Sequence, residues 1–144
     1  MTVGRARRAR RVMVPLLGIA VAVLLGACGF DVRSADVLLL TRTGQGTTLT
    51  LLINDGGSIS CDGGRSKPLV DSLLIRARDL AVNLSGDATA NLHLPAGPGT
   101  IFTYRVKLQA GTVVFSDRDT VHHPVLAETE VFAAQTAQQA CNLN

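Results

Sequence analysis

One stretch decides the fold of this 144-residue chain: Thr47-Thr48-Leu49-Thr50-Leu51-Leu52-Ile53-Asn54-Asp55-Gly56-Gly57. Its first seven residues alternate, with Leu49, Leu51 and Ile53 on one side of an extended chain and mostly threonine on the other. Alternation with a period of two predicts a half-buried strand. The Asp-Gly pair is typical of a tight hairpin turn, because glycine tolerates a positive φ, and residues 58–61 return as the partner strand. The stretch therefore predicts an antiparallel hairpin with one apolar face.

Further strands are predicted on both sides of this hairpin. Residues 37–41 are apolar and precede a Gly-rich turn, which indicates a first strand. Residues 102–108 alternate, so that Tyr104 and its apolar neighbours point inward while Arg105 and Lys107 point outward. Ala110-Gly111 then turns the chain into a last strand over residues 112–116. The outward positive pair favours a solvated sheet face, with an acidic partner as the alternative.

Two helices complete the predicted fold. Leucines keep helical spacing over residues 69–84, Pro68 suits the first helical position, and Gly86 is expected to end the helix. Residues 87–99 are expected to form a loop. Pro124 starts a second helix, in which Leu126, Ala133, Ala137 and Cys141 share a face. The order β-β-β-α-β-β-α predicts an α+β fold, with an antiparallel sheet of about five strands and two helices on one face.

The beginning of the chain is typical of an exported protein. An arginine-rich start precedes an apolar run over residues 16–25, the order found in secretory signals. A membrane anchor is the alternative, but the stretch over residues 12–27 contains Pro15 and two glycines and falls short of the roughly 20 apolar residues that span a bilayer. Leu25-Gly26-Ala27-Cys28 resembles the lipobox of bacterial lipoproteins. That resemblance implies cleavage before Cys28, a diacylglycerol on its thiol and a fatty acyl group such as palmitate on its amino group.

These features predict the domain organisation and the location. Residues 1–27 are expected to be a cleaved signal peptide, residues 28–35 a lipidated cysteine with its linker, and residues 36–144 a single α+β domain. The protein is expected on the extracytoplasmic face of the bacterial cell membrane, held by lipid. Five of the fourteen lysines and arginines lie in the signal, so the remainder carries nine basic and eleven acidic side chains. A nucleic-acid partner is therefore not expected, since that requires a clustered basic face.

The other two cysteines form an even pair outside the cytoplasm, where disulfides persist. We predict a bridge between Cys61 and Cys141; a metal pair or a catalytic thiol is the less favoured alternative. In the chain-entropy model, closing a loop of this length stabilises a fold by about 4–5 kcal/mol.

No motif in the sequence assembles a catalytic site. The chain has no Gly-x-Ser-x-Gly elbow, no His-Glu-x-x-His and no phosphate-binding glycine loop. His122-His123 with Asp117 and Asp119 could bind a metal ion, but a polar loop is favoured. We therefore predict no cofactor, no bound metal and no enzymatic activity.

The mature part also resembles a known family in the order of its elements. Arg42-Thr43-Gly44 before a strand, the helix over residues 69–84, Phe102-Thr103-Tyr104-Arg105-Val106, and a Pro-initiated final helix are similar to the pattern of emfourin. Emfourin-type proteins are small inhibitors of thermolysin-like metallopeptidases. The resemblance covers residues 37–138, although Gly44-Gln45 stands where that family tends to have paired glycines. It implies contacts through the loops at residues 43–46 and 117–123.

Three functions are compatible with these patterns. The favoured one is a lipid-anchored, non-catalytic binding protein, with a protein partner in the cell envelope as one option. An inhibitor of a thermolysin-like metallopeptidase and a carrier of an apolar ligand or lipid are the alternatives. The candidate partner contacts are Arg42, Gly44, Gln45, Tyr104, Arg105, Lys107, Asp117 and Asp119.

Overall fold

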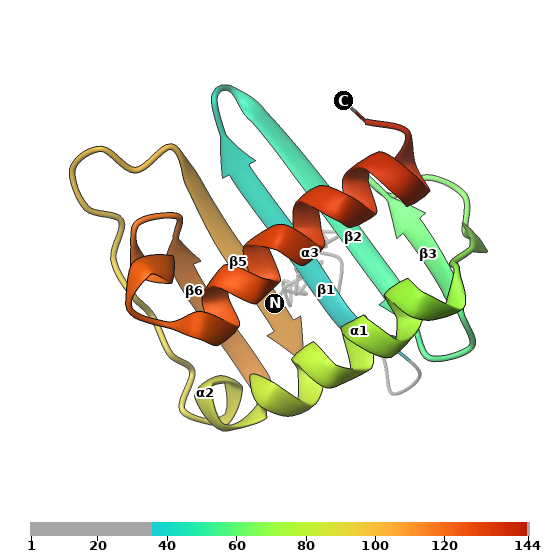
Figure 1. Ribbon diagram of the computed structural model, residues 1–144, viewed down its shortest axis with the longest axis horizontal. Coiled ribbons are helices and arrows are strands. Elements are labelled where there is room, and N and C mark those ends of the chain that lie inside the picture. Colours follow the sequence, from blue (N-terminus) through green and yellow to red (C-terminus); the bar gives the residue numbers. More distant parts are fainter. Residues whose placement is uncertain (1–35, 144) are drawn as a thin grey trace, which may run out of the picture.

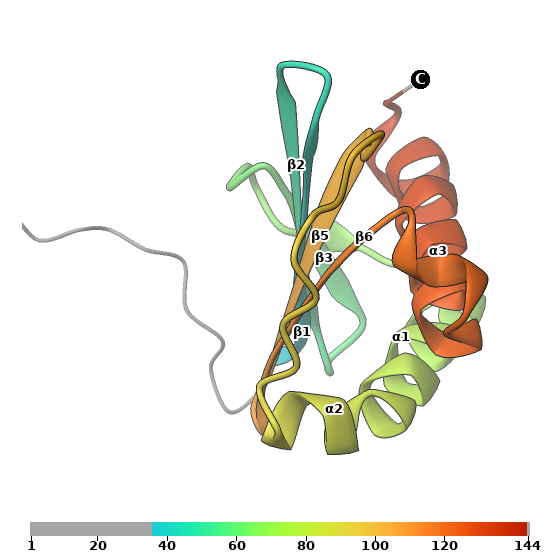
Figure 2. The ribbon, with the colours of Figure 1, turned by 90° about the vertical axis from the view of Figure 1, so that its left-hand side faces the viewer.

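A computed structural model describes residues 36–143. They form one antiparallel sheet, in which the strands follow the order β4-β3-β2-β1-β5-β6, with all three α-helices on the same side (Figures 1 and 2). The predicted α+β class is confirmed, with six strands instead of about five. Cys28, the predicted signal peptide and the predicted linker lie outside the described residues. Within residues 36–143 no helix combines the length and apolar character needed to cross a membrane.

The elements have the following bounds. The strands are β1 (Asp36–Gly44), β2 (Thr47–Asn54), β3 (Ser58–Cys61), β4 (Lys67–Pro68), β5 (Phe102–Leu108) and β6 (Gly111–Ser116). The helices are α1 (Asp71–Asn83), α2 (Ser85–Thr89), a short 3-10 helix at Asp119–Val121 and α3 (Pro124–Cys141).

The hairpin predicted from residues 47–61 is confirmed. Leu49, Leu51 and Ile53 are buried on the helix-covered face of the sheet, and β2 pairs with β3 from Leu51 to Asn54. The positive φ of the turn falls at Gly57, while the Gly56 amide donates to the side chain of Asn54. A side-chain acceptor and a left-handed glycine together close the turn.

The first helix begins later than predicted. Pro68 does not start it, because Lys67 and Pro68 pair with β3 as the two-residue strand β4. The amide of the buried Leu69 donates to the carbonyl of Gly57, which keeps the chain extended up to Val70. The local preference of proline for a helix start is thus overridden by pairing with the sheet edge.

The predicted end of the first helix is confirmed to within one residue, since α1 ends at Asn83 with Leu84 as its C-cap, but Gly86 is not the stop. Gly86 does not stop helical structure, because α2 follows α1 almost directly and includes it. Leu80, Leu84 and Ala88 keep helical spacing across this junction and are all fully buried. Burial of this continuing apolar face outweighs the low helix propensity of one glycine.

The final helix begins at Pro124 as predicted and crosses the sheet obliquely (Figure 1). Leu126, Ala133 and Ala137 are buried as expected, and so are Thr129, Phe132 and Thr136. Cys141, the last residue of α3, forms the predicted disulfide with Cys61 at the end of β3. The bridge thus holds the end of the final helix against the sheet.

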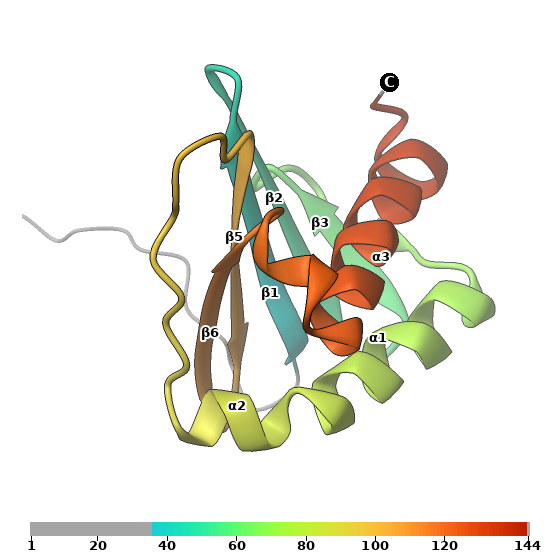
Figure 3. The ribbon, with the colours of Figure 1, turned by 60° about the vertical axis from the view of Figure 1, so that its left-hand side comes forward.

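The outer edge of β6 is closed by the segment that leads from α2 back to β5 (Figure 3). The three amides of β6 that point away from β5 all have acceptors. Thr112 donates to the Asn91 side chain, Val114 to the Leu92 carbonyl, and Ser116 to the Asp119 carboxylate. An edge covered in this way cannot pair with another strand.

Candidate functional site

The sheet has one covered face and one open face. The α-helices pack on the first, and within residues 36–143 no helix lies over the second (Figure 2). Because side chains alternate along a strand, the residues that precede and follow the buried leucines and valines in each strand point to the open face. They include threonines such as Thr41, Thr50 and Thr112, the apolar residues Leu39, Leu52 and Val114, and the basic residues Arg105 and Lys107.

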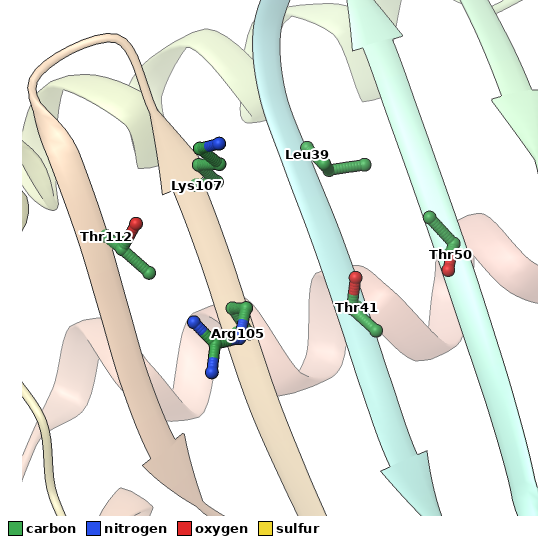
Figure 4. A pocket seen from close by; sticks show the side chains of 6 residues that line it. All are labelled: Leu39, Thr41, Thr50, Arg105, Lys107 and Thr112. Carbon is green, nitrogen blue, oxygen red and sulfur yellow. The ribbon is translucent and has the colours of Figure 1, made fainter. Parts of the chain in front are cut away.

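A groove of about 380 Å³ lies on the open face across four neighbouring strands (Figure 4). It is lined by one leucine, three threonines and two basic residues, namely Leu39, Thr41, Thr50, Arg105, Lys107 and Thr112. The register brings them together: Thr41 on β1 lies opposite both Thr50 on β2 and Arg105 on β5. Lys107 lies between Leu39 on β1 and Thr112 on β6.

The groove is positively charged. Arg105 is exposed and forms no ion pair with another residue in the range 36–143, Lys107 is half-buried, and none of the described residues that line the groove is acidic. Leu39 is only 6% exposed although no helix within residues 36–143 covers it, and its neighbours in the register are Leu52 on β2 and Lys107 on β5. The groove can therefore donate hydrogen bonds and hold negative charge over an apolar floor.

Two of the predicted contacts lie on the other face. Tyr104 is buried, stacks on Phe115 with ring centroids 5.0 Å apart, and forms a hydrogen bond with Glu130. Burial, followed by the nearby charge of Glu130, raises the pKa of Tyr104 to about 12, although Arg42 opposes the shift. The guanidinium of Arg42 lies 4.9 Å from the centroid of the Phe102 ring. Tyr104 is thus a core residue, and Arg42 helps to enclose it.

The remaining predicted contacts lie at the end of the sheet that carries the β1–β2 turn. Gln45 is exposed in this turn with φ 51°, and a Cβ atom on Gly44 would collide with the carbonyl oxygen of Ile101. Asp117 accepts a hydrogen bond from the Ile101 amide at 3.1 Å, and Asp119 accepts from the Ser116 amide and hydroxyl. Both carboxylates therefore hold loop backbone in place.

The loops at residues 43–46 and 117–123, implied as contact sites by the family resemblance, start from the same end of the sheet (Figure 1). Gly44 pairs with Phe102, and the carbonyl of Phe102 accepts from the amide of Asp117. The groove on the open face, in contrast, lies nearer the middle of the strands.

Within residues 36–143, the candidate metal ligands do not form a cluster, and buried side chains fill the layer between sheet and helices. No group of three metal-ligating side chains comes together in the part of the chain that the structure describes, and His122 and His123 are exposed before α3. The layer between sheet and helices is filled by fully buried side chains such as Leu51, Phe115 and Phe132. The apolar-ligand carrier stays a prediction.

Sequence reasoning identified the two basic residues of the groove but missed its threonines. Thr41, Thr50 and Thr112 each lie on the polar side of an alternating strand, so their direction was available from the pattern. The pattern did not show which strands are neighbours, because β1 pairs with β5 across about 60 residues of intervening chain.

Comparison with protein-family models, with curated proteins and with solved structures finds no match.

Proposed function

We propose that this protein is a lipid-anchored, non-catalytic binding protein on the extracytoplasmic face of the bacterial membrane, and that it binds its partner through the open face of its sheet. The observation that carries the proposal is the asymmetry of the sheet, with helices on one face and a groove of hydroxyl and basic side chains on the other. A large face without a helical cover is available to a partner.

The chemistry of the groove supports binding. Threonine hydroxyls, arginine and lysine donate hydrogen bonds, and the two basic groups carry fixed positive charge. A general base would need a group whose pKa lies near the working pH, and the lining residues within the range 36–143 include no histidine or carboxylate. A set of hydroxyl donors and fixed cations can hold an anionic group in place.

The anchor is supported by two further observations. Leu25-Gly26-Ala27-Cys28 has the lipobox pattern, and the Cys61–Cys141 disulfide is typical of an oxidising compartment outside the cytoplasm. Several acyl chains at about 0.8 kcal/mol per buried methylene hold a protein stably on a membrane.

Metabolic labelling with a fatty acid tests the anchor. The native chain should incorporate the label and fractionate with membranes, whereas Cys28→Ala should lose the label and leave the membrane fraction. Cys61→Ala, which removes a different cysteine, should keep the label. Equal labelling of the native chain and Cys28→Ala would contradict the anchor.

Inhibition of a thermolysin-like metallopeptidase is the second candidate. It is favoured by the position of the loops at residues 43–46 and 117–123 at one end of the sheet, where both could enter the same cleft of a partner.

The test of inhibition is whether the purified protein forms an isolable complex with such a peptidase and blocks its turnover. Gln45→Asp at the turn should then weaken inhibition about tenfold, as expected for a central contact. Arg65→Gln, in the β3–β4 loop, should not. Absence of a complex with several such enzymes would eliminate this candidate.

A further inference from the structure

We propose that the groove on the open face binds an extended phosphodiester polymer that lacks aromatic bases, with its chain running along β5. The inference deepens the proposed function, since it names the partner class for the same face, and it does not depend on the lipid anchor. It follows from the spacing of the basic residues, from the hydroxyl groups beside them and from the charge of the rest of the domain.

The two basic side chains form a line along one strand. Arg105 and Lys107 are two residues apart on β5 and point to the same face. Because a strand rises by about 3.4 Å per residue, their backbone positions are about 6.8 Å apart. A chain with repeated negative charges can meet both in succession, with one charge at each cation.

Each basic residue has a threonine directly opposite on a neighbouring strand. Arg105 pairs with Thr41 on β1, and Lys107 pairs with Thr112 on β6. The groove therefore contains two pairs of one cation and one hydroxyl, on opposite sides of β5, and in each pair the two donors belong to adjacent strands about 4.8 Å apart. The other neighbour of each cation is apolar, Val114 for Arg105 and Leu39 for Lys107. A tetrahedral phosphate accepts hydrogen bonds from several directions at once, which suits donors on separate strands better than a planar carboxylate does.

The charge of the domain directs an anionic ligand to this face. Residues 36–143 contain eight basic and ten acidic side chains, so the domain as a whole carries excess negative charge. The groove, by contrast, is lined by basic residues without acidic ones. A polyanion is therefore repelled by the domain as a whole and attracted at the groove.

Among residues 36–143, the absence of aromatic side chains on this face narrows the range of ligands that the groove can bind. Within residues 36–143 the aromatic residues lie on the covered side: Phe102, Tyr104 and Phe115 point toward the helices, and Phe132 is buried on α3. Base or sugar stacking on an aromatic platform, as used for single-stranded nucleic acids, has no counterpart in the groove. The hollow shape of the site also favours a chain that enters it over a planar bilayer surface.

Binding of poly(glycerol phosphate) to the full mature protein in detergent micelles tests the proposal. We expect the double variant Arg105→Gln/Lys107→Gln to weaken binding by at least about tenfold and to reduce the salt dependence by about two released counterions. Thr41→Val should weaken binding a few-fold and leave the salt dependence unchanged. Arg65→Gln, which removes a charge from the β3–β4 loop, should leave both unchanged.

Chemical acylation of lysine locates the bound polymer, because the chain contains only two lysines, Lys67 and Lys107. Poly(glycerol phosphate) should slow the acylation of Lys107 and leave that of Lys67 on β4 unchanged. The proposal is overturned if the double variant binds like the native protein, or if Arg65→Gln weakens binding equally. Equal affinity for poly-L-glutamate would overturn the phosphodiester assignment. In nanodiscs without polymer, equal protection of Lys107 by anionic lipid would identify the bilayer as the occupant instead.

Discussion

At the scale of single residues, Tyr104 shows how the covered face is organised. Its ring stacks on Phe115, and its hydroxyl reaches Glu130 on α3, so that one side chain joins two strands and a helix. The sequence pattern placed it correctly on the inner side of β5, yet we also predicted it as a partner contact. Burial beneath α3 excludes that role in the folded state.

The ionisation of Tyr104 is directly measurable, because it is the only tyrosine in the chain. Burial raises its pKa from 10.0 to about 12. Between these values the unfolded state loses its proton while the folded state keeps it. The free energy of unfolding is therefore expected to fall as pH rises from about 10 to 12. Absorbance at the tyrosinate band should titrate near pH 12 in the native protein and near 10 in denaturant, and Tyr104→Phe should remove this part of the pH dependence. A native midpoint near 10 would contradict the described burial.

Gly44 is a second residue whose role is packing. Because a Cβ atom would collide with the Ile101 carbonyl oxygen, Gly44→Ala is expected to lower the free energy of unfolding by about 1–3 kcal/mol, the usual cost of overpacking. Gly86→Ala is the matched control: nothing lies within 4 Å of its added Cβ, and it should stabilise α2 by about 0.5–1 kcal/mol. Denaturant unfolding measures both, and equal effects would contradict the assignment.

At the scale of elements, α3 is attached to the rest of the domain in three ways besides the hydrogen bond between Tyr104 and Glu130. Phe132 and its neighbours pack on the core, Gln135 accepts a hydrogen bond from Arg76 on α1, and Cys141 is bonded to Cys61. The disulfide joins residues separated by 80 positions, so that it restricts the unfolded chain strongly. The helix is thereby covalently tied to the short strand β3.

Removing the disulfide is expected to destabilise the domain. The double variant Cys61→Ser/Cys141→Ser should lower the free energy of unfolding by about 4 kcal/mol, because the unfolded chain regains the entropy of a long open loop. Denaturant unfolding measures the loss, and reduction of the native protein by a dithiol should reproduce it. Unchanged stability in both experiments would show that native packing alone holds α3.

At the scale of the whole molecule, the core lies on one face of the sheet and the proposed binding groove on the other. The fully buried side chains, including Leu40, Leu51 and Val106, point toward the helices, while the groove residues other than Leu39 are at least partly exposed on the other face. Substitutions in the groove should therefore affect binding without affecting folding.

This separation predicts that Arg105→Gln/Lys107→Gln changes the free energy of unfolding by no more than about 0.5 kcal/mol, as is usual for surface positions. Thermal unfolding of the variant and of the native protein measures the difference. A large loss of stability would mean that these side chains hold the fold, and their effect on ligand binding would then lose its interpretation.

The sequence by itself determined the alternating strands, the Pro124 start of α3, the fold class and the pairing of Cys61 with Cys141, because each follows from a local period or from a count. The tertiary structure alone decided the rest. Only the pairing of β1 with β5 brings Thr41 opposite Arg105, and only the sheet edge draws Pro68 into a strand. Periodicity predicts which side of a strand is apolar, but long-range hydrogen bonding determines which strands are adjacent. A surface site depends on that adjacency, because its residues come from neighbouring strands.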